Sequence, residues 1–207
     1  MNLPNKLTLS RIGILPFFVA VLYVHEFTSD PVMLAAGRWL ALALFVAAAL
    51  TDYYDGKIAR RDNLVTNFGK LFDPLADKLL TMTAFVAFVE LQMPPGRPIL
   101  PAWAIILILA REFLVTGLRS LASAQGRVIA ADRWGKQKTI WQLIGIIVIL
   151  TVMSARETLR ACGIDPAIVD SWLPWILVPV LFVIVSLTVF SGIVYLWKNW
   201  DMVTTNE

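Results

Sequence analysis

Six long stretches of apolar residues, separated by short polar segments, make up most of this chain. They cover approximately residues 9–24, 34–50, 75–93, 102–121, 140–153 and 173–197. Each is close to the ~20 residues that a helix needs to cross a bilayer, except the fifth, which we expect to begin before Ile140. The polar segment 1–11 carries an apolar stripe and suits a helix lying in the membrane interface. The pattern predicts an all-α integral membrane protein with six transmembrane helices and an N-terminal interfacial amphipathic helix.

The composition supports this prediction. Of the 207 residues, 58% are hydrophobic and only 16% are charged, with a mean hydropathy of +0.70. A typical soluble domain carries roughly 25% charged residues. The lower share in this chain therefore excludes an ordinary soluble domain as the simplest interpretation. We expect a single polytopic membrane catalytic domain over residues 1–207, made of the interfacial helix 1–11, a six-helix bundle 12–200 and a cytoplasmic tail 201–207.

The positive charges are distributed unevenly between the two ends of the predicted spans. Of the 18 lysines and arginines, 14 fall in the termini and the segments that would share one side of the membrane. Four fall on the other side, and these are Arg38, Arg97, Arg156 and Arg160. The positive-inside rule then places both termini, residues 51–78 and the 119–138 segment in the cytoplasm. The opposite side includes a turn rich in proline around Gly96.

Two residue counts narrow the possible chemistry. His25 is the only histidine and Cys162 is the only cysteine. A lone loop histidine is usually solvated, which argues against acid–base chemistry based on histidine. A single cysteine excludes an intrachain disulfide.

Four aspartates are concentrated between the second and third apolar stretches. Asp52 and Asp55 are three residues apart, and Asp73 and Asp77 are four apart. Both spacings place the paired side chains on one face of a helix. Four neighbouring carboxylates repel one another, and one or two bound divalent cations would relieve that repulsion. We expect a metal site at the cytoplasmic membrane boundary.

Small residues and one cation accompany these carboxylates. Gly56 and Ala59 keep one helix face small, and Gly69 lies four residues before Asp73. Arg60 offers a planar cation suited to phosphate oxygens. Because bound Mg²⁺ commonly bridges to substrate phosphates, the stretch fits a diphosphate substrate held by a metal ion.

A structural role for individual aspartates stays open at this stage. Asp73 precedes Pro74, as an N-cap residue often does. Asp52 and Asp55 could instead form interfacial ion pairs with Lys57, Arg60 or Arg61.

Eight positions of this stretch resemble the signature of the CDP-alcohol phosphotransferases. The pattern is D-x-x-D-G-x-x-A-R followed by G-x-x-x-D-x-x-x-D, and it is matched by Asp52, Asp55, Gly56, Ala59, Arg60, Gly69, Asp73 and Asp77. The resemblance implies the fold of that family and a bacterial inner-membrane location. It also implies a homodimer, Mg²⁺ or Mn²⁺ as cofactor with two ions per active site, and CDP-diacylglycerol as donor substrate. No nucleic-acid partner is expected.

The same resemblance implies a role for each matched residue. Asp52, Asp55, Asp73 and Asp77 would bind metal, and Asp77 would also be the catalytic base for the acceptor hydroxyl. The residues implied to hold the CDP-lipid are Asn5, Thr8, Asp52, Gly56, Ala59, Arg60, Thr66 and Gly69. The residues themselves leave open whether Asp77 is a ligand, a base or both.

A basic stretch, residues 110–142, is the candidate acceptor site. Arg111 lies about ten residues into the fourth span, where a cation is costly, and Arg119 follows two helical turns later. Lys136 and Lys138 lie beyond the loop, which also holds Arg127 and Arg133. Such a cluster suits a phosphate-bearing acceptor. Alternatively, Arg111 pairs with Glu112 or Asp77, and the loop is merely positive-inside.

The motifs A-R-E-x-x-x-x-x-L-R and G-K-x-K-T in this stretch resemble the branch of the family whose acceptor is glycerol 3-phosphate. The resemblance assigns the acceptor phosphate to Arg111, Arg119, Lys136 and Lys138. Glu112 would either orient Arg111 or lie near the acceptor hydroxyls.

Several rival functions remain at this stage. Within the same chemistry, the acceptor could be inositol phosphate, serine or phosphatidylglycerol. A divalent-cation transporter also uses membrane carboxylates, but its site tends to lie near the bilayer midplane. A prenyl-diphosphate transferase would need a second aspartate-rich cluster, which the sequence lacks.

Overall fold

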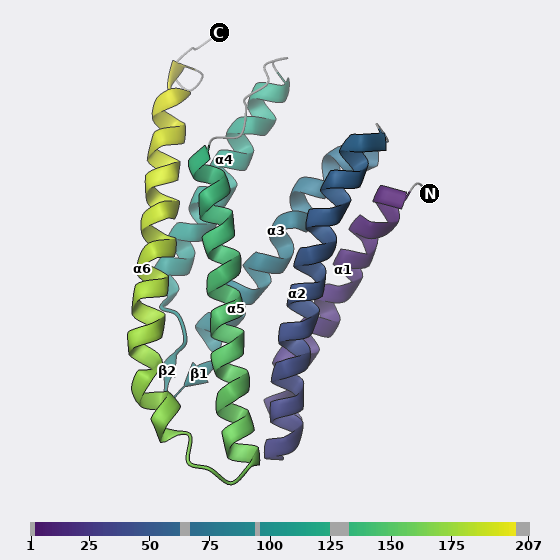
Figure 1. Ribbon diagram of the computed structural model, residues 1–207. Helices are drawn as coiled ribbons and strands as arrows, with labels where there is room; N and C mark the ends of the chain where they lie inside the picture. Colours follow the sequence, from purple (N-terminus) through teal and green to yellow (C-terminus); the bar gives the residue numbers. More distant parts are fainter. Residues whose placement is uncertain (1–2, 63–66, 94–95, 125–132, 202–207) are drawn as a thin grey trace. The chain divides into compact units, whose positions relative to one another are not determined.

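The computed structural model describes a helical protein with one small hairpin (Figure 1). The described backbone covers residues 3–62, 67–93, 96–124 and 133–201, and the described side chains cover 12–51, 78–93, 96–123 and 133–201. In chain order the described elements are α1 (Leu3–Leu22), the 3-10 helix η1 (Val24–Glu26), α2 (Pro31–Asp62), α3 (Asn67–Glu90), β1 (Gln92–Met93), β2 (Arg97–Pro98), α4 (Ala102–Ala124), α5 (Arg133–Ala161) and α6 (Ala167–Lys198).

Each of the six predicted apolar stretches corresponds to one α-helix, in the predicted order, although the stretch 9–24 extends past α1 into η1 and the stretch 75–93 past α3 into β1. The prediction that the fifth helix begins before Ile140 is confirmed, because α5 begins at Arg133. Among the described residues, three helices contain a stretch long and apolar enough to span a membrane: Pro31–Thr51 of α2, and the whole of α5 and α6. The fold is therefore that of a helical membrane protein, while six crossings stay a prediction.

The N-terminal segment differs from the expected division into an interfacial helix and a first span. Residues 3–11 and the apolar residues after them form one continuous helix, α1. The sequence offers no reason for a break near residue 11, because neither glycine nor proline occurs between Pro4 and Gly13. Pro16 lies inside α1, which is tolerated more readily in membrane helices than in soluble ones.

The chain divides into two compact units, and each unit contains two segments that are distant in sequence. The first unit comprises residues 1–87 and 146–174, and the second comprises residues 88–145 and 175–207. Helices α5 and α6 therefore contribute residues to both units. The prediction of one catalytic domain is not tested by this division.

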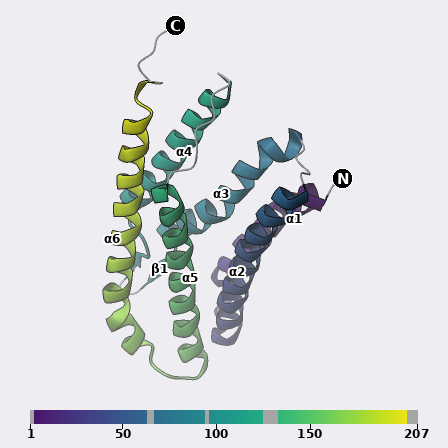
Figure 2. The ribbon, with the colours of Figure 1, turned by 45° about the horizontal axis from the view of Figure 1, so that its top comes forward.

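Within the first unit, α1 packs along α2, as Figure 2 shows. The rings of Phe18 and Phe45, both fully buried, lie 6.0 Å apart between centroids. At Gly37 of α2, a Cβ atom would come within 2.6 Å of the Val24 side chain, so this approach requires glycine. Burial of two phenylalanines holds this helix pair together.

The same unit contains a network of buried charges at the end of α5 and the start of α6. Arg156 is 4% exposed and donates to Asp170 through Nε at 2.6 Å and through Nη2 at 3.2 Å. Its Nη1 donates to Glu157 at 3.1 Å. Nearby, the Trp39 indole of α2 donates to the Thr158 hydroxyl at 3.0 Å. These contacts tie α2, α5 and α6 together.

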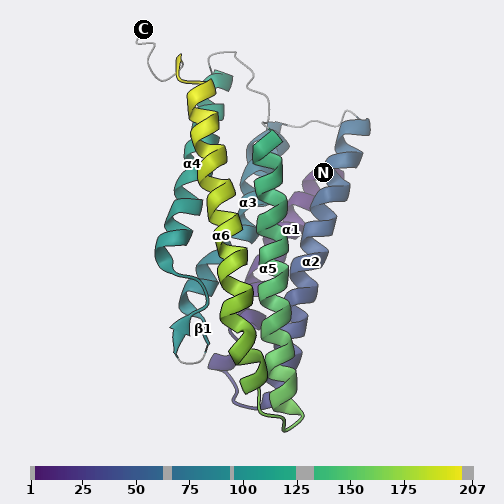
Figure 3. The same ribbon diagram turned by 60° about the vertical axis from the view of Figure 1, so that its left-hand side comes forward.

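Within the second unit, the hairpin connects α3 to α4 (Figure 3). Gln92 pairs with Pro98 and Met93 with Arg97. Gly96 has a φ of +84° and donates its N–H to the Met93 carbonyl at 2.8 Å. A positive φ favours glycine, so the turn predicted around Gly96 is confirmed.

Helices α5 and α6 also approach closely within this unit. A Cβ atom on Gly145 of α5 would overlap the Ile184 side chain of α6 and would lie 3.1 Å from Val180. Close backbone approach at a small residue is typical of helix packing in membranes.

Candidate functional site

The helices α2 and α3 carry the four aspartates of the sequence signature. Helix α2 does not end with its apolar stretch at Thr51 but continues to Asp62, so it includes both Asp52 and Asp55. Helix α3 begins at Asn67 and includes Asp73 and Asp77. The i, i+3 and i, i+4 spacings therefore occur on continuous helices, which places each pair on one helical face. All four side chains lie outside the described ones.

The start of α3 removes one alternative role for Asp73. This residue lies six positions after Asn67, inside the helix, so it does not occupy the N-cap position of α3. Pro74 likewise lies inside the helix rather than at its first turn. The capping interpretation of Asp73 is therefore wrong.

The chemistry of this donor set fits a hard divalent cation. Carboxylate oxygens are the protein ligands that Mg²⁺ prefers, and two same-face pairs supply up to four of them. Elsewhere in the described part of the chain, no group of three or more His, Cys, Asp and Glu side chains could hold a metal ion.

The other residues implied to hold the CDP-lipid are described only by their backbone or not at all. Gly56, Ala59 and Arg60 lie on α2 beyond Asp55, and Gly69 lies in the first turn of α3. Asn5 and Thr8 lie on α1. Thr66 lies outside the described residues.

The second unit brings the candidate acceptor residues of α4 and α5 together with residues of α6. Arg111 lies near the middle of α4, between glycines of the two other helices. A Cβ atom on Gly192 of α6 would be 3.0 Å from the Arg111 Cγ atom, and one on Gly135 of α5 would be 3.5 Å from its Nη2 atom. The Arg111 side chain thus lies against two glycines: the approach at Gly192 is too close for a Cβ atom without adjustment, whereas a Cβ atom at Gly135 would make only an ordinary van der Waals contact.

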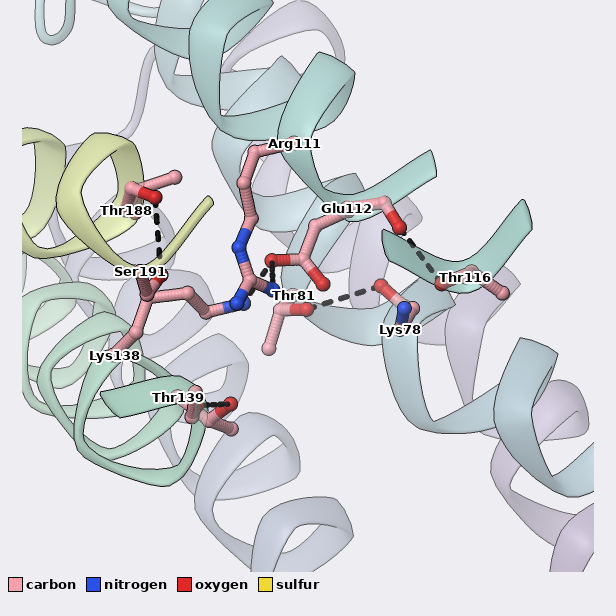
Figure 4. Close-up of polar contacts among 10 residues, drawn as sticks. Lys78, Thr81, Arg111, Glu112, Thr116, Lys138, Thr139, Thr188 and Ser191 are labelled. Atoms are coloured by element: carbon pink, nitrogen blue, oxygen red, sulfur yellow. Dashed lines mark hydrogen bonds and ion pairs between the residues drawn. The ribbon is translucent and has the colours of Figure 1, made fainter. Parts of the chain in front are cut away.

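Glu112, the residue after Arg111, forms the centre of a buried ion cluster (Figure 4). Its Oε1 atom accepts a hydrogen bond from the Lys138 ammonium of α5 and lies 3.5 Å from Arg111 Nη1. Glu112 is 6% exposed and Lys138 is 3% exposed. The pairing of Arg111 with Glu112, which the sequence raised as an alternative, is confirmed. The other alternative, pairing with Asp77, is not tested, because the Asp77 side chain lies outside the described residues.

Arg119 reaches the same helix, α6, as Arg111 does. Its guanidinium carbon lies 5.6 Å from the centroid of the Tyr195 ring, in a cation–π contact. Tyr195 is three residues after Gly192, so the two arginines contact one face of α6. This agrees with the eight-residue spacing that predicts a shared face on α4.

The two lysines of the G-K-x-K-T motif have different surroundings. Lys136 is exposed on the first turn of α5, whereas Lys138 is buried against Glu112. Residues two apart on a helix point in nearly opposite directions, which accounts for the difference. Arg133 is exposed at the start of α5, and Arg127 lies outside the described residues.

Sequence reasoning missed the polar residues that α5 and α6 contribute to this unit. The buried atoms Gln142 Nε2, Thr188 Oγ1, Tyr195 Oη and Arg111 Nε have no hydrogen-bond partner among the described residues. Buried polar atoms are normally paired, so these four could bond to a polar ligand or to water. A signal was present in the sequence, because Thr188, Ser191 and Tyr195 interrupt an otherwise apolar helix at helical spacing.

Comparison with known proteins shows the family of the chain. The sequence profile of the CDP-alcohol phosphatidyltransferase family matches residues 1–185. A CDP-diacylglycerol–glycerol-3-phosphate 3-phosphatidyltransferase of Bacillus subtilis (strain 168) is 39% identical, over 100% of this chain and 99% of its own length.

Two plant proteins are similar over 97% of this chain. One, a CDP-diacylglycerol–glycerol-3-phosphate 3-phosphatidyltransferase 2 of Arabidopsis thaliana, is 31% identical and covered over 80% of its length. The other, a cardiolipin synthase (CMP-forming) of Oryza sativa subsp. japonica, is 30% identical and covered over 58% of its length. Since the family profile matches most of the chain and a full-length relative is 39% identical, the chain belongs to the CDP-alcohol phosphatidyltransferase family.

Proposed function

We propose that this protein transfers the phosphatidyl group of CDP-diacylglycerol to sn-glycerol 3-phosphate, giving phosphatidylglycerophosphate and CMP. The observation that carries the proposal is the match over the full length of both chains to the Bacillus subtilis relative of that name. The basic residues Arg111, Arg119, Lys136 and Lys138 on α4 and α5 support it, because a phosphorylated acceptor needs cations.

The reaction forms one phosphorus–oxygen bond and breaks another. The 1-hydroxyl oxygen of glycerol 3-phosphate attacks the phosphorus that carries diacylglycerol, and the bond from that phosphorus to the CMP oxygen breaks. CMP leaves with the electron pair, and the hydroxyl proton passes to Asp77. Phosphoryl transfer depends mainly on positioning and on neutralising the developing charge.

The donor would bind beside the aspartates of α2 and α3. Gly56 and Ala59 leave room for CDP close to the helix, and Arg60 would pair with a phosphate oxygen. Thr66, Gly69, Asn5 and Thr8 would make further contacts with the CDP-lipid.

Asp52, Asp55, Asp73 and Asp77 would hold Mg²⁺ or Mn²⁺, with two ions in each active site. A bound divalent cation supplies Lewis-acid stabilisation of the phosphate oxygens. The chain itself supplies the carboxylate cradle and the base. Asp77 would act as base only if the cation leaves one of its oxygens available for the proton.

The acceptor would enter from the cytoplasm and bind at α4 and α5. We further propose that the six helices all cross a bacterial inner membrane, with both termini and the aspartates on the cytoplasmic side. The distribution of lysine and arginine supports this orientation. A homodimer is also part of the proposal.

An acceptor panel with the purified protein in lipid nanodiscs tests the function. CMP release is measured with CDP-diacylglycerol and either glycerol 3-phosphate, inositol phosphate, serine or phosphatidylglycerol, during a titration of Mg²⁺ and Mn²⁺. We expect release with glycerol 3-phosphate alone. Release only with another acceptor would contradict the choice of acceptor, and phosphatidylglycerol is the sharpest rival because of the similarity to a cardiolipin synthase.

A second arm addresses the transporter alternative. Sealed vesicles containing the protein but no CDP-diacylglycerol are loaded with a divalent-cation indicator. Cation flux in the absence of lipid donor would favour a carrier over a transferase.

A further inference from the structure

The Glu112 carboxylate lies between two cations that belong to different helices. Within α4, its Oε1 atom is 3.5 Å from Arg111 Nη1, and from α5 it accepts the hydrogen bond of the Lys138 ammonium (Figure 4). The side chains of Arg111 and Glu112 are 12% and 8% exposed. In such surroundings the attraction between opposite charges is screened less than at the surface.

Lys138 is buried against this carboxylate, whereas Lys136 is exposed. The side chain of Lys138 is 3% exposed, and removing Glu112 would take away a charge partner of a buried ammonium. A direct contact with an acceptor arriving from water therefore suits Lys136 better than Lys138.

Arg111 is closely approached at its stem, and its guanidinium has atoms that can still donate. A Cβ atom on Gly192 would lie 3.0 Å from the Arg111 Cγ atom, whereas one on Gly135 would lie at an ordinary contact distance, 3.5 Å, from Nη2. The Nη1 atom faces Glu112, and the buried Nε atom has no partner among the described residues. The guanidinium plane is thus fixed by Glu112 at one edge, while another edge can still donate.

We infer that Glu112 is a positioning residue for the acceptor site: it orients the Arg111 guanidinium and neutralises Lys138, and it does not touch the acceptor. This inference rests on the proposed function. Without the carboxylate, Arg111 and Lys138 would repel each other, and the guanidinium would leave the orientation in which it can bind the acceptor phosphate.

Glu112→Gln tests the inference, and Glu157→Gln is the matched control. Glu157 is also a glutamate with little exposed side chain, 13%, that contacts two arginines, Arg156 and Arg160. It belongs to the first unit, 19 residues after Lys138 in the chain. KM and kcat are measured separately for glycerol 3-phosphate and CDP-diacylglycerol in nanodiscs.

We expect Glu112→Gln to raise the KM for glycerol 3-phosphate by about tenfold or more, as for loss of one charge-assisted contact. The KM for CDP-diacylglycerol should stay within about twofold, since the donor binds elsewhere, and the control should change neither. An unchanged acceptor KM in folded Glu112→Gln would overturn the inference. Absence of CMP release from the wild-type protein with glycerol 3-phosphate would instead contradict the proposed function.

A double variant separates positioning from stability. In Glu112→Gln/Lys138→Met the buried ammonium is removed together with the carboxylate that pairs with it, so thermal stability should return toward that of the wild type. We expect the acceptor KM to stay raised, because Arg111 still lacks its carboxylate. Recovery of the wild-type KM, or failure of both variants to fold, would make Glu112 a structural residue and overturn the inference.

Discussion

Gly192 of α6 and Arg111 of α4 lie so close together that a Cβ atom on Gly192 would be 3.0 Å from the Arg111 Cγ atom. This distance is tighter than an ordinary van der Waals contact, so a methyl group can fit only if the arginine stem moves. Moving the stem would also disturb the other end of the side chain, where Arg111 Nη1 lies 3.5 Å from Glu112 Oε1. The position of the Arg111 side chain therefore depends on the absence of a side chain at Gly192.

Gly192→Ala should therefore displace Arg111 and weaken acceptor binding. We expect a loss of about 1–3 kcal/mol in stability, as for overpacking of a core, and a several-fold rise in the KM for glycerol 3-phosphate. Gly117→Ala is the control, since nothing lies within 4 Å of a Cβ atom at Gly117. Helix propensity favours alanine at both positions, so an equal loss in the two variants would contradict the role of the close contact at Gly192.

Asp77→Asn should abolish turnover but leave the protein folded and able to bind CDP-diacylglycerol. Loss of a general base lowers kcat by about 100-fold or more, which CMP release would measure. Asp30→Asn is the control: Asp30 Oδ1 accepts the Val32 N–H at the start of α2 at 2.9 Å, and asparagine can make the same bond. Full activity of purified Asp77→Asn would remove Asp77 from the catalytic role.

Lys136→Ala should raise the KM for glycerol 3-phosphate by about tenfold, because an exposed ammonium near the acceptor supplies one charge-assisted contact. The value of kcat should change little if the contact is equally strong in the ground and transition states. Gln137→Ala alters the neighbouring exposed residue without changing charge and should have no effect. A normal acceptor KM in Lys136→Ala would place the acceptor phosphate elsewhere.

Arg156→Ala should destabilise the first unit strongly. Its guanidinium makes two bonds to Asp170 and one to Glu157. Removing it takes both of these bonds from the Asp170 carboxylate, which is 20% exposed, while Glu157 keeps its contact with Arg160. We expect a loss of about 3–5 kcal/mol, measured by unfolding in detergent. Arg160→Ala breaks only a 3.5 Å pair of a half-exposed side chain and should cost little. Equal losses of unfolding free energy in the two variants would contradict the expectation that the buried arginine contributes more than the half-exposed one.

The sequence predicted the helices well because a long apolar stretch leaves few alternatives. All six appear in order, and the predicted turn occurs at Gly96, where φ is positive. The end of α2 could not be predicted from hydropathy. The end of an apolar stretch indicates where a helix leaves the hydrocarbon core, and the helix itself can continue into polar surroundings. The polar residues after Thr51 include no proline before Asp62, so the helix continues.

Long-range contacts explain what sequence spacing could not predict. The sequence grouped Lys138 with the cations for the acceptor phosphate, whereas the structure shows its ammonium bound to Glu112. Neither Gly192 nor Tyr195 was linked to the arginines, because they belong to a helix more than 70 residues later in the chain. Spacing within one helix shows which side chains share a face but not what lies opposite that face.

The continuous helix α2 joins an apolar stretch to Asp52. Its apolar stretch Pro31–Thr51 is 21 residues, or about 31 Å of helix, which nearly equals the thickness of a hydrocarbon core. Asp52 follows in the same helix, so on the proposed topology it belongs to the boundary between the lipid tails and the headgroups. A lipid substrate would then react there without its acyl chains leaving the bilayer.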